Sequence, residues 1–477
     1  MSSRPISTLA RRLVTTAALA LAALPVIATA QTATSPASGV ALPTQPPATQ
    51  RPPNIILILA DDIGTEAINA YGGQYYTPRI DELARRGVRM DNAHATPLCT
   101  PSRVRIMTGK ESHRNYTAFG YLDPKERTFA HVLKDAGYTT GIVGKWQLSG
   151  NAFDKRTGAT PQQAGFDTSF LWQLESRARS GSRYWGPTLS DNGKTTIHES
   201  GFGPDMMNDR AMAFIEENKA KPFFLYYTLP LPHDPFVPTP DQPNATGDQP
   251  RFAAMVSYLD KLVGNVTDKV RALGLEQDTL ILFAGDNGTS TRIVSKVDGV
   301  EVQGGKGKST IAGTHVPFVA SWPGHIPEGR ISAAMVDFTD VLPTIARAAG
   351  VAVPAGIDGK DQMDVFAGRK PAARDWIFMH YAPVWIAEPA RFIFDGQYKL
   401  YGDGKFVALD PRTSTEAPVT GRTGASRRAQ FQKLLDNMGD GPLNPARYPM
   451  CANRPSVDPA RPAIEAGCDR VRSLDGE

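Results

Sequence analysis

The sequence predicts an α/β protein with a doubly wound, mostly parallel sheet flanked by helices and a smaller C-terminal antiparallel β subdomain. The first observation is a set of apolar, β-branched runs typical of strands buried on both faces, at residues 54–60, 139–145, 222–228, 279–284 and 316–322. The second is that helical patterns separate these runs, at residues 78–86, 128–136, 205–219, 250–273 and 337–349. The third is a group of short strand-like segments, at residues 391–394, 398–401 and 405–409.

The composition indicates a large globular protein. With 477 residues, of which 41% are hydrophobic and 21% charged, the chain differs from disordered, collagen-like, coiled-coil and multi-span membrane proteins. Lys and Arg number 52 against 48 Asp and Glu, and the excess comes mostly from Arg4, Arg11 and Arg12. The remaining chain is therefore nearly neutral, which gives no support for nucleic-acid binding.

Residues 1–30 predict an export signal peptide. A basic start is followed by an apolar stretch at residues 14–26 and by a cleavage site of small residues at 28–30. The apolar stretch is short for a membrane span and contains Pro25, so a retained membrane anchor is the less favoured alternative. We therefore expect an exported protein, periplasmic or secreted, without stable membrane insertion.

The segments around the predicted folded core differ from it in composition. Residues 31–53 are rich in Pro, Thr, Ser, Ala and Gln, which predicts a flexible linker. We expect a catalytic domain over residues 54–360, and a C-terminal subdomain over 361–477 that ends in a polar, wrapping tail. Of the three cysteines, Cys451 and Cys468 lie in this tail and could pair with each other, which leaves Cys99 without a partner.

Acidic and amide side chains directly follow two of the predicted strands. Asp61 and Asp62 follow the first apolar run, and Asp286 and Asn287 follow the fourth. Ligands of open α/β sheets bind at the carboxyl ends of the strands, so these side chains are candidates for one site. Their oxygen atoms suit a hard divalent cation such as calcium. The alternative is that they cap helices and form turns, as Asp and Asn often do.

Cys99 lies at the start of a predicted helix. Thr100 is expected to cap this helix and Pro101 to occupy its first turn, with Arg103 one turn further on. The positive end of a helix binds anionic groups such as sulfate or phosphate. The same place would also suit a cysteine thiolate nucleophile, and the simplest alternative is a buried structural thiol.

The motif Cys99-Thr100-Pro101-Ser102-Arg103, followed by Thr108-Gly109, resembles the signature of type I sulfatases of the alkaline phosphatase superfamily. The resemblance covers roughly residues 54–359 and includes the order of the other motifs. It implies a calcium ion and the oxidation of Cys99 to formylglycine by a formylglycine-generating or sulfatase-maturating enzyme. The family's calcium ligands match Asp61, Asp62, Asp286 and Asn287, with the modified Cys99 completing the set.

The same resemblance assigns roles to further cationic residues. Lys145 and Lys306 match the two lysines that contact the sulfate, and the spacing to Pro317 favours Lys306 over Lys308. His233 matches the histidine beside the leaving-group oxygen. The implied reaction begins when one hydroxyl of hydrated formylglycine attacks sulfur. Arg103 and the two lysines offset charge, His233 protonates the departing oxygen, and the second hydroxyl expels sulfate.

Two segments depart from the family pattern. Gln147 stands where the family commonly has the histidine credited with deprotonating the formylglycine hydrate, and a glutamine cannot act as a base. Residues 309–315 replace an acid, two glycines and an arginine. The base for sulfate release is therefore unassigned among water, a carboxylate beside the metal, and His315.

Together these patterns predict an exported sulfatase that cleaves a sulfate monoester. We expect a sulfated small molecule or glycan as substrate, with preference for a carbohydrate. Trp172, Tyr184 and Trp185 could stack on sugar rings or could simply pack beneath a loop. One alternative is a phosphonate monoester hydrolase or phosphodiesterase of the same superfamily. Another is an exported binding protein in which Cys99 is never oxidised and a sulfated ligand is held without turnover.

Overall fold

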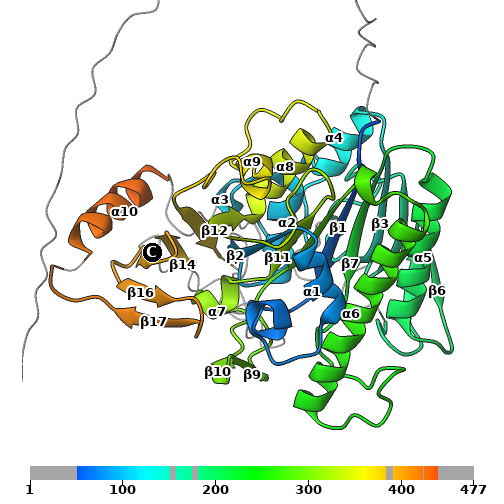
Figure 1. The fold of residues 1–477 in the computed structure, drawn as a ribbon, viewed down its shortest axis with the longest axis horizontal. Coiled ribbons are helices and arrows are strands. Elements are labelled where there is room, and N and C mark those ends of the chain that lie inside the picture. Colours follow the sequence, from blue (N-terminus) through cyan, green and yellow to red (C-terminus); the bar gives the residue numbers. More distant parts are fainter. Residues whose placement is uncertain (1–50, 151–156, 175–180, 383–389, 423, 439–477) are drawn as a thin grey trace, which may run out of the picture. The chain divides into compact units, whose positions relative to one another are not determined.

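A ten-stranded sheet forms the centre of the protein (Figure 1). The computed structural model describes residues 51–150, 157–174, 181–382, 390–422 and 424–438. In spatial order the strands of this sheet are β12 (Arg330–Asp337), β2 (Val88–His94), β11 (Phe318–Ser321), β8 (Thr279–Gly285), β1 (Asn54–Ala60), β7 (Phe223–Leu229), β3 (Thr139–Lys145), β4 (Thr168–Trp172), β5 (Thr188–Asp191) and β6 (Lys194–Ile197).

The centre of the sheet is parallel, as predicted. Strands β8, β1, β7, β3 and β4 all run in the same direction. The predicted strand at 316–322 forms as β11, but it is antiparallel to both β8 and β2. The reason is the connection: between β8 and β11 lie the hairpin of β9 (Val294–Val297) and β10 (Val300–Gln303) and one short helix, α7 (Ile311–Thr314). A parallel strand needs a crossover that returns the chain to the opposite edge, and this connection does not provide one.

Helices cover both faces of the sheet, which confirms the doubly wound prediction. Ile55, Leu57 and Leu59 of β1 pack in one apolar core, and Ile56 and Ile58 pack in the other. The first core contains residues of α2 (Cys99–Thr108), α4 (Phe129–Asp135), α8 (Val341–Ala348) and α9 (Met363–Phe366). The second contains residues of α1 (Pro78–Arg85), α5 (Gly203–Asn218) and α6 (Asp248–Ala272). Because both faces of the sheet are covered, successive residues of a strand are all buried, and the strand sequences are continuous apolar runs.

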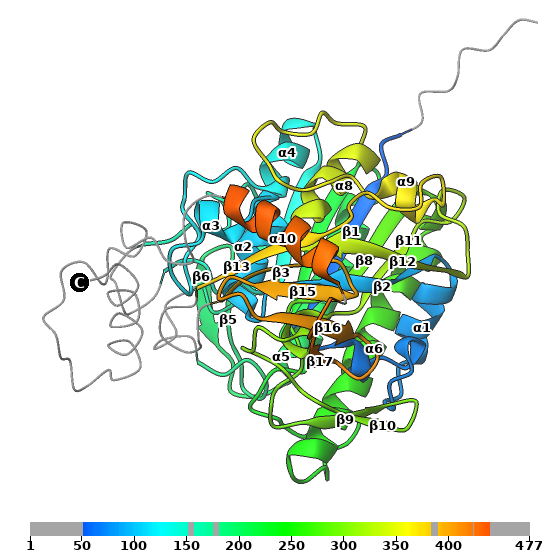
Figure 2. The same cartoon turned by 90° about the vertical axis from the view of Figure 1, so that its left-hand side faces the viewer.

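A second, antiparallel sheet follows in the C-terminal part, as predicted (Figure 2). Its face toward the main sheet packs Met379, Tyr381 and Phe392 with Leu98 and Met335. The sheet consists of β13 (Ile377–Tyr381), β14 (Ala390–Phe394), β15 (Tyr398–Tyr401), β16 (Phe406–Asp410) and β17 (Thr415–Pro418).

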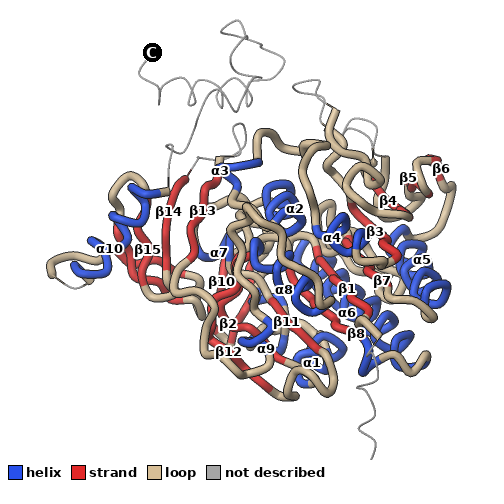
Figure 3. The backbone as a smooth tube through the Cα atoms, turned by 90° about the horizontal axis from the view of Figure 1, so that it is seen from above, coloured by secondary structure: helices blue, strands red, loops and turns tan. Residues whose placement is uncertain are grey.

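The start of the predicted polar tail is a helix, α10 (Ala425–Asn437), which lies along the second sheet (Figure 3). Phe431 and Leu435, four residues apart, are its buried residues and pack with apolar side chains of that sheet. The rest of the helix is polar, so the sequence shows no wide apolar stripe there. The predicted signal peptide, nearly all of the linker, and Cys451 and Cys468 lie outside the described residues.

Short helical turns complete the described structure, and the predicted helix at 337–349 begins as one of them. These turns are α3 (Ser112–Asn115) and the 3₁₀ helices η1 (Thr65–Ala67), η2 (Asn69–Tyr71), η4 (Glu276–Asp278) and η5 (Phe338–Asp340). Within the described ranges, no helix combines the length and the apolar character needed to cross a membrane.

Candidate active site

The carboxyl ends of β1 and β8 bring the predicted metal ligands together. These strands are parallel neighbours in which Ala60 pairs with Gly285, so the residues that follow them emerge at one edge of the sheet. The amide Nδ2 of Asn287 donates to Asp62 Oδ1 at 2.8 Å, and the backbone N–H of Asp62 donates to Asp286 Oδ1 at 3.1 Å. All four side chains, including Asp61, are fully buried.

The chemistry of this set fits a hard divalent cation. Ligand atoms of Asp61, Cys99 and Asp286 lie within 4.8 Å of one another, and so do those of Asp61, Asp62 and His233. The Oδ1 atom of Asn287 is buried and has no hydrogen-bond partner among the described residues. A buried amide oxygen without a donor is rare in folded proteins, and a cation would satisfy it.

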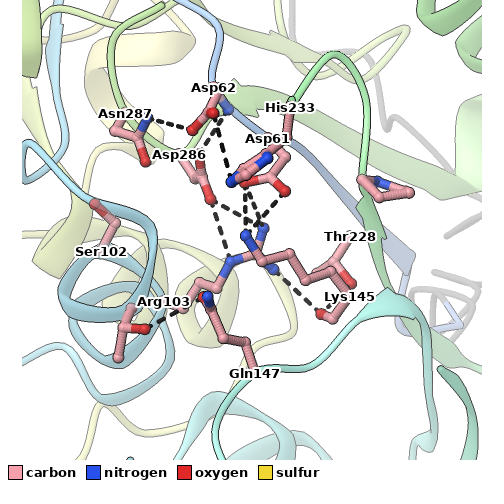
Figure 4. Close-up of polar contacts among 12 residues, drawn as sticks. Asp61, Asp62, Ser102, Arg103, Lys145, Gln147, Thr228, His233, Asp286 and Asn287 are labelled. Atoms are coloured by element: carbon pink, nitrogen blue, oxygen red, sulfur yellow. Dashed lines mark hydrogen bonds and ion pairs between the residues drawn. The ribbon is translucent and has the colours of Figure 1, made fainter. Parts of the chain in front are cut away.

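Three cationic side chains each contact one of the three carboxylates, and Figure 4 shows the contacts of Lys145 and Arg103. Lys145 Nζ donates to both oxygens of Asp61 at 2.8 and 2.9 Å. Arg103 donates to Asp286 Oδ2 through two of its nitrogens, at 2.9 and 3.2 Å. Lys306 Nζ donates to Asp62 Oδ2 at 2.5 Å. The structure thus brings together the predicted sulfate-binding residues and the predicted metal ligands.

These contacts set the charge state of the buried acids. Burial alone would raise the pKa of Asp61, but the positive charges of Lys145, His233 and Arg103 hold it well below the ordinary range of a carboxyl group. Burial, together with the nearby charge of Asp61, raises the pKa of Asp286. Two carboxylates this close repel each other, which is the condition that a bound divalent cation would relieve.

Cys99 is the first residue of α2 and its side chain is buried, with 1% of the residue exposed. The prediction that Thr100 caps this helix is wrong, because the helix begins one residue earlier and Leu98 precedes it without a side-chain cap. The hydroxyl of Thr100 instead donates to Gln147 Oε1 at 3.2 Å. Burial raises the pKa of the Cys99 thiol, which disfavours an ordinary thiolate nucleophile.

Two loop residues form the outer side of the site. Lys306 Nζ lies 3.0 Å from His233 Nε2, and the two side chains are 20% and 15% exposed. Burial lowers the pKa of His233, whereas the negative charges of Asp62 and Asp61 act in the opposite direction. Lys308 is exposed to solvent, so the structure agrees with the choice of Lys306 that the sequence spacing favoured.

The structure removes one of the candidates for the base. His315 is buried, its Nδ1 lies 3.3 Å from the hydroxyl of Thr65, and its Nε2 lies 3.0 Å from the carbonyl oxygen of Asp91. Its ring stacks on that of His94. Because both ring nitrogens of His315 have partners outside the set of site residues, His315 does not supply the missing base.

The aromatic residues of the insertion between Lys145 and His233 divide into two groups. Trp172 and Tyr184 are buried, so for them the packing interpretation is correct. The hydroxyl of Tyr184 donates to the backbone carbonyl of Pro230 at 2.8 Å and also to that of His233, which ties the insertion to the His233 loop. Trp185 is 46% exposed and remains available to a ligand.

Arg183 was not among the site residues predicted from the sequence, but the structure brings it beside the site. Its guanidinium carbon lies 4.0 Å from the ring centre of Trp172, and its NH1 lies 3.7 Å from Asp61 Oδ2. Arg183 belongs to no motif, and its only sequence signal was a positive charge next to the aromatic residues of the insertion.

Two protein families match the sequence over most of its folded part. The Sulfatase family matches residues 53–351, and the family described as N-sulphoglucosamine sulphohydrolase, C-terminal, matches residues 312–402. The chain is 30% identical to arylsulfatase A of Homo sapiens over 441 residues, which cover 83% of each protein. It is 29% identical to N-acetylgalactosamine-6-sulfatase of Canis lupus familiaris over 399 residues, which cover 74% of this chain and 72% of that protein.

Solved structures share the fold at lower sequence identity. A protein solved in complex with its substrate, D-glucosamine-2-N,6-O-disulfate, superposes with a TM-score of 0.67 at 21% identity, over 81% of this chain and 97% of that one. The phosphonate monoester hydrolase of Agrobacterium radiobacter superposes with a TM-score of 0.61 at 20% identity, over 80% of this chain and 95% of that one. The family match, the arylsulfatase relatives and the shared fold lead to one conclusion: this chain belongs to the type I sulfatase family of the alkaline phosphatase superfamily and is a sulfuric ester hydrolase.

Proposed function

We propose that the protein is an exported sulfatase that removes sulfate from a sulfated carbohydrate, using a formylglycine made from Cys99 and a calcium ion. The observation that carries this proposal is the position of Cys99, buried at the start of α2 within ligand distance of Asp61 and Asp286. Two similar proteins support a carbohydrate substrate. One is named N-acetylgalactosamine-6-sulfatase, and the other was solved in complex with a disulfated glucosamine. The exposed ring of Trp185 is consistent with contact to a sugar.

The groups that the proposal adds to the chain have distinct tasks. Asp61, Asp62, Asp286, Asn287 and the modified Cys99 would hold the calcium ion, which supplies positive charge for the sulfuryl oxygens. A formylglycine hydrate supplies one hydroxyl that attacks sulfur and a second whose deprotonation expels sulfate, and an unmodified cysteine or serine has no second hydroxyl. A formylglycine-generating or sulfatase-maturating enzyme is therefore a required partner.

Cationic residues of the chain bind and stabilise the transferred group. Arg103, Lys145 and Lys306 offer N–H donors at the same edge of the sheet, where charge builds on the sulfuryl oxygens as the ester bond breaks. Arg103 is fixed further by a hydrogen bond from NH1 to the backbone carbonyl of Lys145, at 3.2 Å. Fixed donors need little reorganisation during the reaction, which is the basis of their contribution to the rate.

His233 is the group that would give a proton to the departing oxygen. Its Nε2 faces the site, 3.6 Å from Asp62 Oδ2, while its Nδ1 lies 2.9 Å from Asp234 Oδ1. Burial lowers the pKa of His233, Asp62 and Asp61 oppose this shift, and the contact with Asp234 fixes the orientation of the ring. Gln147 cannot accept a proton and both ring nitrogens of His315 have other partners. The remaining candidates for the proton lost on sulfate release are solvent water and a carboxylate of the site.

Two measurements on protein from its own host test this proposal. Peptide mass spectrometry examines the tryptic peptide from Met90 to Arg103, in which conversion of the thiol to an aldehyde lowers the mass by about 18 Da. Aldehyde capture reveals any hydrated form. Ion chromatography then measures sulfate released from sulfated hexoses, sulfated hexosamines and 4-nitrophenyl sulfate, with Cys99→Ala as the inactive control.

The possible outcomes separate the proposal from its alternatives. An aldehyde at residue 99 with sulfate release from sugars supports the proposal. Preference for a phosphonate monoester or a phosphodiester would favour the alternative of a phosphonate monoester hydrolase or phosphodiesterase of the same superfamily. An intact thiol with retained sulfate binding but no turnover would favour the binding-protein alternative. Export is tested separately by identifying the N-terminal residue of the mature protein. Cleavage after Ala30 would make that residue Gln31.

A further inference from the structure

Arg183 is the cationic residue at the site that the family motifs do not include. It follows β4 and precedes β5, in the insertion between Lys145 and His233. Its guanidinium lies on the ring face of Trp172, with a further ring, that of Tyr184, at 5.7 Å. Trp172 is itself held by a hydrogen bond from its Nε1 to the backbone carbonyl of Gly181, at 3.2 Å. Stacking on a fixed indole restricts the guanidinium to one plane.

The neighbouring backbone is anchored as firmly as the side chain. The backbone N–H of Gly203 donates to the carbonyl oxygen of Tyr184 at 2.8 Å, and the Tyr184 hydroxyl reaches the loop that carries His233. A Cβ atom at Gly203 would come within 2.2 Å of the Arg183 carbonyl oxygen, which shows how closely α5 approaches this turn. Arg183 is therefore not a freely rotating surface side chain, although 14% of it is exposed.

The hydrogen-bonding state of Arg183 differs from that of the other three cations of the site. Arg103, Lys145 and Lys306 each donate to a carboxylate at 2.9 Å or less. The NH1 of Arg183 is buried and has no hydrogen-bond partner among the residues that the structure describes. Its distance of 3.7 Å from Asp61 Oδ2 is too long for a hydrogen bond. A buried guanidinium N–H without an acceptor is costly, which indicates that an acceptor arrives from outside the chain.

We infer that Arg183 binds the sulfuryl group of the substrate as a fourth cation, beside Arg103, Lys145 and Lys306. NH1 lies 3.7 Å from the carboxylate that Lys145 contacts, so its unsatisfied donor is beside the reaction centre and not beside a remote part of the substrate. A sulfuryl oxygen is anionic and fits a charge-assisted hydrogen bond from a guanidinium. This inference rests on the proposed function, because it assumes that the ester sulfate lies between these cations.

The position of Arg183 also predicts when its contact matters. Negative charge on the sulfuryl oxygens increases as the ester bond breaks, so a donor that is already in place stabilises the transition state more than the bound ester. Loss of Arg183 should therefore lower kcat as well as weaken binding of sulfate. Trp172 would act as a positioning residue that holds the guanidinium, without touching the substrate.

The test compares Arg183→Met and Arg183→Lys with Arg210→Met in the mature, metal-loaded protein. Arg210 lies on α5 and pairs with Glu217 at 3.2 Å, which makes Arg210→Met a matched control. Calorimetry measures binding of inorganic sulfate, steady-state kinetics measures hydrolysis of the best ester from the substrate panel, and thermal unfolding monitors the fold. We expect Arg183→Met to lower kcat/KM by about 100-fold and to weaken sulfate binding, with partial recovery in Arg183→Lys. Arg210→Met should match the parent protein.

The results separate this inference from the proposed function. Unchanged sulfate binding and kinetics in a folded Arg183→Met variant would overturn the role of Arg183, while activity of the parent protein would leave the proposed function intact. Unchanged sulfate binding with reduced turnover of an ester that carries a second anionic group would also overturn it, because Arg183 would then bind that second group. If the parent protein hydrolyses no sulfate ester, the proposed function fails, and calorimetry with inorganic sulfate still decides whether Arg183 binds the anion.

Discussion

The inner and outer halves of the site are built in different ways. The inner half, with Asp61, Arg103, Lys145 and Asp286, comes from the ends of β1, β3 and β8 and from α2, and every one of these side chains is at most 1% exposed. The outer half, with Arg183, His233 and Lys306, comes from loops, and its side chains are 14–20% exposed.

This difference separates structural and functional roles within one site. In the inner half the charges neutralise each other inside the fold, so removing one of them leaves its partner buried and unpaired. In the outer half the cationic side chains are partly exposed, so their ion pairs contribute less to stability and the same kind of substitution should mainly affect the reaction. The variants below test whether this division holds.

The largest effect should come from Lys145→Met, compared with Lys306→Met. Lys145 contacts both oxygens of the fully buried Asp61, so its loss should lower the free energy of unfolding by about 3–5 kcal/mol and also abolish activity. Lys306→Met should abolish most activity with a smaller loss of stability, because its ion pair is partly exposed and Asp62 keeps the hydrogen bond from Asn287. Urea unfolding and sulfate release measure both properties. Equal losses of stability in the two variants would contradict the division of the site.

An intermediate effect is expected from His233→Gln, which keeps a polar side chain but removes the proton donor. With a sugar sulfate, kcat should fall by about 100-fold or more, because the departing alkoxide needs a proton. With 4-nitrophenyl sulfate the loss should be much smaller, since nitrophenolate leaves without protonation. Steady-state kinetics on both esters gives the ratio. The same loss on both would mean that His233 binds the sulfuryl group and does not protonate the leaving oxygen.

The smallest effect is expected from Gln147→Ala, with Thr100→Val as its companion. Gln147 accepts a hydrogen bond from Thr100 and has no ionisation of its own, so its loss should lower kcat by about fivefold, equivalent to about 1 kcal/mol. The shape of the pH–rate profile should stay unchanged in both variants. In contrast, Gln147→His should add an ionisation at about pH 6.5 to that profile. A lost ionisation in Gln147→Ala would show that Gln147 controls the base indirectly.

The two carboxylates of the inner half, Asp61 and Asp286, could be predicted from the sequence because they follow buried strands. The apolar runs that end at Ala60 and at Ala284 are long and rich in β-branched residues. An acidic residue just after such a strand lies at the carboxyl edge of the sheet, where ligands bind. Lys145, the last residue of β3, and Arg103 of α2 were assigned by resemblance to the family. The direction of β11 could not be predicted, because an apolar run reads the same in either direction.

The outer half was only partly accessible to sequence reasoning. His233 and Lys306 were found by resemblance to the family, whereas Arg183 belongs to no motif and its neighbours were read only as aromatic side chains. His315 was a candidate base because of its residue type, but its ring nitrogens lie within hydrogen-bond distance of the Thr65 hydroxyl and the Asp91 carbonyl oxygen. The role of a loop residue depends on what the folded loop contacts, and spacing along the chain does not define those contacts.

The sequence by itself determined the α/β class, the order of the strands and helices that carry the site, and the candidate metal ligands at two strand ends. These features follow from local periodicity and from residues placed directly at strand ends, which need no knowledge of distant contacts. Only the tertiary structure decided that β11 is antiparallel, that α10 covers the second sheet, and that Arg183 has a buried NH1 beside Asp61 without an acceptor among the described residues. Each of these depends on residues far apart in the chain, whose meeting is fixed by packing and not by local sequence.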